Sequence, residues 1–504
     1  RIIMAEKRKN SRKKTDAKDR KINQILTLVG LAIAAVFFIV SIIFVVMLHY
    51  VDLIPLKYKV LVAVILLLCT IALVITQRWK IGGIITKVVA VLLCVVLIVG
   101  CVYLGYTRGA IGRMAGGNKQ VETISIYVME SDKAEKLEDI NGYTCGKISN
   151  IDSDNTQKVI DDISQNKGVN LTYKDYTSVT GTVDALLSGE VESVMLNEAY
   201  MSMLDDMEGY QDVSSKVRVV YSTDIEYSVK GDVNEDYLSN DDVITLYVSG
   251  IDTEGTPSAV SRSDVNILIS INTKTHQVIM INTPRDYYVP LSISHGVKDK
   301  LTHAGIYGID CSMDTLEMLY EVNIDYYVRM NFTGFRKIVD ALGGVTVHSD
   351  YDFVTTHGGK HISVGNNTLN GDEALGFARE RYAFSDGDRQ RGRNQMEVIK
   401  AIFQKMTTTT MLTNYTSILS SISDSMSTNM PYDEIGNLAK MQLDEMPSWD
   451  IQSYSVNGTG DYAVPFSMSS SAYVMVPDMN TVNQAKEYLT QLYNNEIVDI
   501  SDNN

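Results

Sequence analysis

The sequence predicts a membrane-anchored α/β protein, in which three N-terminal transmembrane helices precede a larger folded part. Two patterns carry this prediction: three long apolar runs without a charged residue, and a later alternation of strand-like and helix-like segments. A third observation concerns function, because five arginines crowd into fifteen residues of a chain whose formal net charge is −16. At 504 residues the chain is too long for one hydrophobic core, so we expect several folded parts.

The three apolar runs cover residues 22–51, 60–77 and 88–107. Each is long enough for a hydrocarbon layer that needs roughly 20 residues of helix. A buried helix of a soluble protein would show a polar stripe, and these runs show none. A cleaved signal peptide has a shorter apolar region and would not be followed so closely by further runs. We therefore expect three transmembrane helices within residues 22–107.

Basic residues predict the orientation of these helices. Residues 1–21 hold ten Lys and Arg against three Asp and Glu, a net charge of +7, and the second loop carries Arg78, Lys80 and Lys87. Since such segments stay in the cytoplasm, we expect a multi-pass protein of the cell membrane with a cytoplasmic N-terminus and extracytoplasmic C-terminal domains. The remaining chain sums to −23, the difference between −16 and +7. This acidic body argues against nucleic acid as a partner, because phosphate backbones need a basic face.

The part beyond the membrane runs divides into two predicted domains. Residues 118–235 alternate strand-like and helix-like runs, which favours a small accessory α/β domain. This segment offers no cluster of His, Cys or Arg, so we interpret it as a spacer or an interaction module. An acidic stretch then leads into a second domain over residues 240–495. Cys145 and Cys311 fall in different domains, and a disulfide between them is an alternative that we do not favour.

The five arginines lie in the stretch from Phe377 to Gln395, which reads FARERYAFSDGDRQRGRNQ. A guanidinium group presents a planar fork of donors that matches phosphate oxygens two at a time. The bland alternative is a solvated helix face with local salt bridges. Two upstream segments, Ser261–Ile271 and Ile281–Pro290, each set an Arg and an Asp beside an apolar run. Together the three segments favour a pocket for a doubly phosphorylated anion.

The spacing of two of these arginines predicts where a helix ends. Arg379 and Arg381 are two residues apart, so on a regular helix they would not share a face. We therefore expect the helix that opens at the Asn370–Gly371 turn to end near Arg379. Such an end would let both guanidinium groups reach the same anion.

At this level of detail the motifs resemble a known family, the LytR–CpsA–Psr family of cell-wall enzymes. The resemblance covers about residues 240–415 and rests on VSGIDT, SRSDVNILISI, INTPRDYYVP, KLTHAGIYG, NFTGFRKIVDALGGVTV, LNGDEALGFARER and GDRQRGRNQMEVI. It implies an α/β catalytic domain with a central mixed sheet flanked by helices. A three-helix anchor followed by an accessory domain is similar to the capsule-type members. One departure is Asn394, where members often carry a second Arg beside the Gln.

The resemblance implies a transferase of Gram-positive bacteria. It would move a glycopolymer from an undecaprenyl-pyrophosphate carrier in the membrane to a muramyl hydroxyl of peptidoglycan, assisted by Mg²⁺. Its partners would be the lipid-linked glycan, the peptidoglycan acceptor and membrane lipid, and not nucleic acid. Whether the polymer is capsule, teichoic acid or another wall glycan stays open, as does the base that activates the acceptor.

The resemblance also assigns roles to residues of this chain. Asp252 and Asp264 match the carboxylates associated with the metal. The pyrophosphate-contacting and catalytic positions are matched by Arg262, Asp264, Arg285, Arg379, Arg381, Asp388, Arg391 and Gln395, with Asp388 as the acidic partner of the arginines. Arg393 is left outside the pocket. Elementary chemistry agrees, because a pyrophosphate leaves only if its growing charge is neutralised by preorganised cations in a water-poor site.

The remaining candidate functional residues are supported by weaker patterns. The strand-like runs NILISI and VIMIN, with Phe332, Phe335, Leu342 and Phe377, could line a groove for the lipid tail, although an ordinary core is the interpretation that we favour. His357 and His361 sit among glycines in an expected loop, so a metal site there is not predicted. His303 could approach the ligand, but we favour a structural role. The sequence holds no GxSxG, HExxH, Walker-type loop or CxxC motif.

Three alternatives to the transferase remain. The same pocket would admit water as a nucleophile, which describes a prenyl pyrophosphate pyrophosphatase. A transcriptional regulator would need a cytoplasmic DNA-binding domain, whereas only a 21-residue basic tail is expected there. A scaffold without chemistry would leave the arrangement of Arg and Asp unexplained.

Overall fold

The structure is a computed structural model of the chain. It describes residues 2–115, 119–149, 151, 153–204, 207, 209–229, 234–251, 258–385, 387–406, 418, 421–423 and 425–500. Contacts divide the chain into two compact units. One comprises Arg1–Gly112 and Pro431–Pro447, and the other Arg113–Met430 and Ser448–Asn504.

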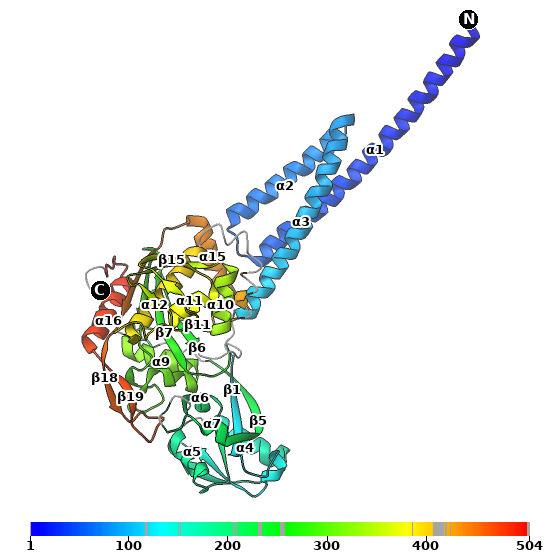
Figure 1. The fold of residues 1–504 in the computed structure, drawn as a ribbon. Helices are drawn as coiled ribbons and strands as arrows, with labels where there is room; N and C mark the ends of the chain where they lie inside the picture. The colour runs from blue at the N-terminus through cyan, green and yellow to red at the C-terminus, as the bar shows by residue number, and fades with distance from the viewer. Residues whose placement is uncertain are drawn as a thin grey trace. The chain divides into compact units, whose positions relative to one another are not determined.

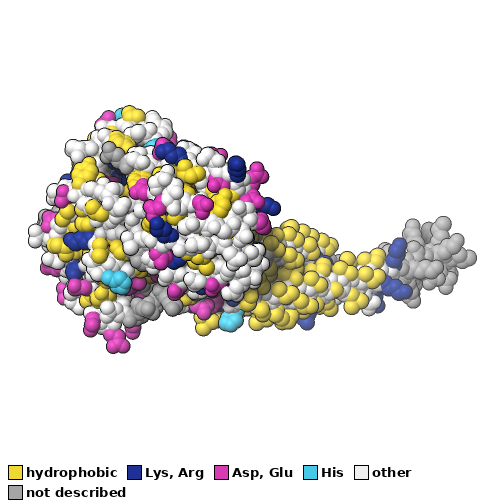
Figure 2. Space-filling view, turned by 90° about the horizontal axis from the view of Figure 1, so that it is seen from below, with side chains coloured by type: hydrophobic (Ala, Val, Ile, Leu, Met, Phe, Trp, Pro, Cys, Tyr) yellow, Lys and Arg dark blue, Asp and Glu magenta, His cyan; other side chains and the backbone are white. Residues whose placement is uncertain are grey.

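The first unit is built on three long helices (Figure 1), which are α1 (Ile2–Val51), α2 (Leu56–Thr76) and α3 (Lys80–Met114). Stretches long and apolar enough to cross a membrane are Arg20–Val51, Leu56–Thr76 and Gly82–Met114. Hydrophobic side chains cover the surface of these helices in Figure 2, as expected where lipid replaces water. The prediction of three membrane helices is confirmed by length and composition.

Helix α15 (Tyr432–Glu445) belongs to this first unit, although it lies within the range 240–495 predicted for the second domain. Lys440 and Lys59 donate to the two carboxylate oxygens of Asp52, at 2.6 and 2.5 Å. These two hydrogen bonds outweigh burial and lower the pKa of Asp52 to about 2. The Tyr432 hydroxyl donates to the carbonyl of Val51 at 2.6 Å. The segment is therefore tied to the ends of α1 and α2.

The accessory domain is an α/β structure, as its alternating pattern predicts. Its five-stranded sheet has the order β3 (Thr172–Tyr176), β2 (Thr144–Ile148), β4 (Ser193–Asn197), β1 (Lys119–Met129) and β5 (Val217–Ser228). Its helical segments are η1 (Leu137–Ile140), α4 (Ser153–Asp161), the π-helical η2 (Asp162–Asn166), α5 (Val179–Leu187), α6 (Ala199–Leu204) and α7 (Val213–Lys216). Strands β2, β3 and β4 run parallel, and β1 pairs antiparallel with β4 and β5.

The part predicted as the second domain is organised around a six-stranded mixed sheet, as expected. Its order is β16 (Met426–Thr428), β11 (Tyr326–Asn331), β6 (Val243–Ile251), β7 (Ser263–Asn272), β8 (Gln277–Asn282) and β17 (Asp450–Ser455). The pairs β6–β11 and β8–β17 are parallel, and β11–β16, β6–β7 and β7–β8 are antiparallel. The hairpin-like pair expected from NILISINTKTHQVIMIN is β7 and β8.

Shorter strands and the helices complete this domain. The strands are β9 (Tyr288–Pro290), β10 (Lys298–Lys300), β12 (Val345–Ser349), β13 (Phe353–Val354), β14 (His361–Ile362), β15 (Gly365–Leu369), β18 (Gly458–Ala463) and β19 (Ala472–Pro477). The helices are α8 (Leu301–Ala304), η3 (Gly305–Tyr307), α9 (Ile309–Tyr320), α10 (Phe332–Ala341), α11 (Gly371–Arg379), α12 (Gly387–Met406) and α16 (Met479–Tyr493).

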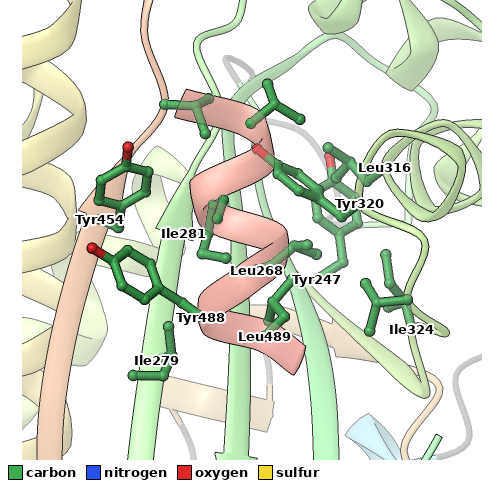
Figure 3. Close-up of a cluster of buried hydrophobic side chains, with 14 of the residues drawn as sticks. Tyr247, Leu268, Ile279, Ile281, Leu316, Tyr320, Ile324, Tyr454, Tyr488 and Leu489 are labelled. Atoms are coloured by element: carbon green, nitrogen blue, oxygen red, sulfur yellow. The ribbon is translucent and has the colours of Figure 1, made fainter. Parts of the chain in front are cut away.

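Both faces of the central sheet are covered by helices. Alternate residues of a strand point to opposite faces. Leu268, Ile279 and Ile281 pack with Leu489 of α16 on one face (Figure 3), whereas Ile267 and its neighbours pack with Met396 of α12 on the other. Each such side chain contributes about 1.5–3 kcal/mol when fully buried.

The packing of this core argues against the alternative that these strands line a groove for the lipid tail. The apolar residues of NILISI and VIMIN pack in the core clusters, and Leu342 and Phe377 are buried as well. These residues are structural, as the favoured interpretation has it, whereas Phe332, the first residue of α10, lines the cavity described below. Cys145 and Cys311 are both buried and free, so the disulfide that we did not favour is not formed.

Candidate functional site

The cavity of about 810 Å³ next to the central sheet brings the predicted residues together. Its lining includes Arg262, Asp264, Arg285, Arg379, Arg381, Asp388, Arg391 and Gln395. Asp252, the second expected metal ligand, lies outside the described residues. Lys300 and Asp286 also line the cavity, which gives six cations against three carboxylates, a net charge of +3 with histidines neutral. A cavity of this sign in a chain of net charge −16 is suited to an anion.

One wall is formed where β7 begins and β8 ends. Because the two strands are antiparallel neighbours, these positions meet at one edge of the sheet. Nη1 of Arg285 donates to both carboxylate oxygens of Asp264, at 3.1 and 3.0 Å, and the Thr302 hydroxyl donates to one of them at 3.3 Å. Burial opposes ionisation of Asp264, but the charges of Arg285, Arg391 and Arg262 outweigh it and lower the pKa of Asp264.

Arg262 is placed by its neighbours on both sides. The buried Arg329 of β11 donates to the carbonyl of Ser261 at 3.0 Å. Gly305 packs directly against the same segment, since a Cβ atom there would lie 2.6 Å from the Ser261 carbonyl oxygen. A larger residue at Gly305 would push this wall away from the cavity.

Asp286 and Lys300 are site residues that sequence reasoning missed. Nζ of Lys300 lies 3.2 Å from one carboxylate oxygen of Asp286, and Nε of Arg285 lies 3.6 Å from the other. Burial disfavours the charged form of Arg285, but Asp264, Asp286 and Asp388 overcome this and raise the pKa of Arg285. The position of Asp286 directly after Arg285 in INTPRDYYVP is the signal that could have identified it.

The helix that carries Arg379 ends at that residue, as the spacing of the arginines predicts. The next residue, Glu380, is fully buried and has extended backbone. Its carboxylate accepts hydrogen bonds from the backbone N–H groups of Thr356, Tyr382 and Ala383. This turn takes Arg381 out of the helix, so both guanidinium groups line the cavity.

An aromatic ring packs against each of the two guanidinium groups. The guanidinium carbon of Arg379 lies 4.4 Å from the ring centre of Phe332. That of Arg381 lies 4.7 Å from the ring centre of Tyr382, whose hydroxyl accepts a hydrogen bond from Arg381 at 2.6 Å. Such contacts hold a planar cation in place while its edge remains available to a ligand.

The first turns of α12 supply the third wall. Asp388 pairs with Arg391 at 2.5 Å, and Gln395 follows Arg391 one turn later on the same helix face. Burial raises the pKa of Asp388. The charge of Arg391 lowers this pKa and that of Asp286 raises it, and the net effect is a raised pKa. Gly392 allows α12 to lie close to the end of β8, because a Cβ atom at this position would be 2.1 Å from Nδ2 of Asn282, the last residue of β8.

Asn394, the departure from the family pattern, has a structural partner in this chain. It is buried, and its amide donates to the carbonyl of Phe377 in α11 at 3.1 Å and accepts from Gln390 at 2.9 Å. Asn394 therefore fastens α12 to the last turn of α11, next to Arg379. Arg393 does not line the cavity, and its Nε donates to Gln390 at 2.9 Å.

Residues from outside the recognised motifs complete the lining. The hairpin β18–β19 and its connection contribute Tyr462, Tyr473 and Met468, and the accessory domain contributes Met203 and Met207. His303 and His357 also line the cavity. Nothing local in the sequence marks the positions in the β18–β19 hairpin and in the accessory domain, which approach the site only through tertiary packing, whereas His303 lies in the motif KLTHAGIYG.

Comparison with known proteins agrees with this geometry. Residues 216–490, more than half of the chain, match the model of the LytR_cpsA_psr family. A transferase from Enterococcus faecalis, described as polyisoprenyl-teichoic acid–peptidoglycan teichoic acid transferase TagU, is 31% identical over 287 residues, which cover 56% of this chain and 89% of the relative. The protein of the same description from Bacillus anthracis is 32% identical over 271 residues, 53% of this chain and 85% of the relative. The chain therefore belongs to the LytR–CpsA–Psr family of cell-wall glycopolymer transferases.

Two solved structures are similar to part of this chain. The structure described as TagT bound to LI-WTA is 28% identical and covers 50% of this chain and 92% of its own, with a TM-score of 0.41. TagV of B. subtilis is 25% identical and covers 52% of this chain and 100% of its own, with a TM-score of 0.43. A second family model, that of a DNA polymerase processivity factor, matches residues 85–196. That match begins inside the membrane-length stretch of α3, and no functional conclusion is drawn from it.

The buried turn at Glu380 generates a prediction about stability. Burial disfavours its ionised form, but the hydrogen bonds from Thr356, Ala383 and Tyr382 outweigh this and lower the pKa of Glu380. A lowered folded-state pKa stabilises the fold above the unfolded pKa of about 4.3, and this contribution is lost as pH falls through the folded value. Replacement of Glu380 by Gln should cost about 1–3 kcal/mol at neutral pH.

The measurement is unfolding of the detergent-solubilised protein as a function of pH. The difference in the free energy of unfolding between wild type and the Glu380→Gln variant should shrink as the pH falls below about 4. Glu496→Gln, at an exposed position, is the matched control and should change stability little at any pH. A difference that does not vary with pH would show that the charge of Glu380 does not hold the turn.

Proposed function

We propose that this protein transfers a glycopolymer, as its sugar phosphate, from a polyprenyl-pyrophosphate carrier to a hydroxyl group of peptidoglycan. The observation that carries the proposal is the cavity of net charge +3, in which arginines from three separate walls converge. A pyrophosphate diester carries two negative charges, so the site can neutralise it and retain charge for a transition state. The two relatives described as teichoic acid–peptidoglycan transferases support the same reaction class.

In this reaction the acceptor oxygen attacks the phosphorus atom that carries the sugar. A new phosphodiester bond forms, the bond from that phosphorus to the bridging oxygen breaks, and the lipid monophosphate leaves with the electron pair. Arg285, Arg379, Arg381 and Arg391 would bind the phosphate oxygens and the growing charge on the leaving group. Since their partner carboxylates and rings already fix them, they need no reorganisation during the step.

The described residues are compatible with a Mg²⁺ ion bound between the protein and the pyrophosphate. Asp264 accepts three hydrogen bonds from Arg285 and Thr302, which leaves lone pairs on its two oxygens. No group of three or more His, Cys, Asp or Glu side chains that could enclose a metal occurs in the described part of the chain. One or two carboxylates together with phosphate oxygens and water are the usual surroundings of Mg²⁺. When bound by Asp264, with Asp252 as the expected second ligand, the ion would supply Lewis-acid neutralisation of the phosphate.

We also propose that the catalytic and accessory domains lie outside the cell. The basic residues of the N-terminal tail and of the loop between α2 and α3 support this orientation. Protease added to intact protoplasts should then remove the chain beyond residue 118. Protection of that region, with cleavage seen only after lysis, would contradict the proposed topology.

The arginine clamp is tested by conservative substitution. Lys cannot reproduce the bidentate geometry of Arg, so Arg285→Lys, Arg379→Lys and Arg381→Lys should each weaken binding of a prenyl pyrophosphate. A charge-assisted hydrogen bond is worth about 1.5–3 kcal/mol, which corresponds to roughly a 10- to 150-fold change in Kd. Arg393→Ala is the matched control on α12 and should bind normally. Equal damage from Arg379→Lys and Arg393→Ala would indicate a structural salt-bridge network instead.

The metal proposal is tested by removal of the ion and of its ligand. EDTA should abolish transfer by the wild-type protein, and added Mg²⁺ should restore it. Asp264→Asn, which keeps the shape of the side chain, should reduce transfer strongly. Analysis of the products with and without a peptidoglycan acceptor separates transfer from hydrolysis of the pyrophosphate. Undiminished transfer in EDTA would refute a role for Mg²⁺.

A further inference from the structure

A buried pair of side chains on the cavity wall has no role in the chemistry so far. His303 of α8 and Asp299 of β10 are 3% and 0% exposed, and Nδ1 of His303 lies 2.7 Å from Oδ1 of Asp299. His303 lines the cavity, one residue after Thr302, which contacts Asp264. The pair therefore lies beside the wall that carries Arg285.

The surroundings of Asp299 determine which nitrogen of His303 carries hydrogen. Besides His303, Asp299 accepts hydrogen bonds from the backbone N–H groups of Lys300 at 2.7 Å and Ser467 at 2.9 Å. An ionised carboxylate accepts only, so the short contact places the hydrogen on Nδ1 and leaves a lone pair on Nε2. Nε2 has no hydrogen-bond partner among the described residues. It nevertheless keeps some accessible surface. This nitrogen is therefore the polar atom that His303, as a lining residue, can offer to a ligand in the cavity.

The accessory domain holds the same pair through the β18–β19 connection. Ser467 lies in this connection, with its hydroxyl 3.0 Å from Nδ1 of His303. At the start of α5, the Val179 N–H donates to the Ser467 carbonyl at 3.3 Å. Thr180 and Ser469 pair through their hydroxyls at 2.6 Å, and the Ser469 N–H donates to Thr180 at 2.8 Å. A continuous set of contacts thus runs from the accessory domain to His303.

The carboxylates and the second histidine of the cavity are poorly suited to accept a proton. The carboxylates of Asp264, Asp286 and Asp388 each pair with Arg or Lys side chains. His357 also lines the cavity, but no carboxylate contacts its ring among the described residues, so nothing orients it. An imidazole oriented by a buried carboxylate, with its second nitrogen open, is the arrangement that general bases share.

We propose that His303 is the general base for the acceptor hydroxyl and that the accessory domain positions it through Ser467. The inference rests on the proposed transfer reaction. As the acceptor oxygen bonds to the sugar-bearing phosphorus, its proton passes to Nε2 of His303, and the lipid monophosphate departs with the electron pair of the broken bond. The imidazolium that forms is stabilised by Asp299, and it returns its proton to water after the product leaves.

The test compares binding with transfer in the full-length protein. His303→Ala and His303→Gln should bind a prenyl pyrophosphate within about threefold of wild type, because the arginines remain. Transfer should fall by about 10²- to 10⁴-fold, the usual contribution of a general base. His348→Ala, which removes an exposed histidine of β12, is the matched control and should change neither quantity.

Chemical rescue distinguishes a base from a structural residue. Imidazole added to His303→Ala should restore part of the lost transfer, whereas pyrazole, a ring of the same shape but a far weaker base, should not. Asp299→Asn, which removes the negative charge beside Nδ1 that would stabilise the imidazolium, should lower kcat and leave binding of the donor intact. Ser467→Ala should lower kcat without changing the KM for the donor, and Ser467→Thr should recover it.

Two results would overturn the role of His303 while leaving the transfer reaction in place. One is equal rescue by imidazole and pyrazole, and the other is a loss of prenyl-pyrophosphate binding in both His303 variants, which would make the residue structural. If His303→Ala does not fold, the His303→Gln variant decides between the base and a structural role. A wild-type protein that binds the donor but releases only free sugar phosphate, with acceptor present, would refute transfer itself and the base with it.

Discussion

The pairing of guanidinium groups with buried carboxylates is the interaction on which the rest of the site depends. Six cations around one cavity repel each other, and the repulsion is strong where water is scarce. Asp264, Asp286 and Asp388 offset half of that charge and hold the side chains in fixed orientations. Because three positive charges remain uncompensated, a bound diphosphate diester with two negative charges offsets most of them. The cavity is therefore built for an anion before any ligand enters.

The backbone serves this arrangement at three places. The edge where β7 begins and β8 ends carries the Arg285–Asp264 pair, the helix end at Glu380 turns Arg381 toward Arg379, and Gly392 lets α12 approach β8. Each depends on a contact that tolerates little change. A Cβ atom at position 392 would collide with the Asn282 side chain, and a neutral side chain at position 380 would weaken the turn before Arg381, although neither change alters an arginine.

Much of this site could be predicted from the sequence because its motifs are local. Arg262 and Asp264 lie at the start of one strand, and the two-residue spacing of Arg379 and Arg381 predicts the helix end that the structure has. His303 was interpreted as structural, because the spacing of KLTHAG does not reveal Asp299 and Ser467 as its neighbours. Ser467 is 164 residues from His303, and only the fold brings it there. The sequence of the accessory domain predicts only a spacer or an interaction module for the same reason, since its contacts with the β18–β19 connection leave no local signal.

The central claim is that one cavity holds the pyrophosphate against arginines from all three walls. The most direct measurement is an experimental structure of the protein with a polyprenyl pyrophosphate bound. The account predicts diphosphate oxygens within hydrogen-bond distance of Arg285, Arg379 and Arg391, with the Arg285–Asp264 pair intact. A diphosphate bound elsewhere on the protein, with this cavity filled only by water, would contradict it.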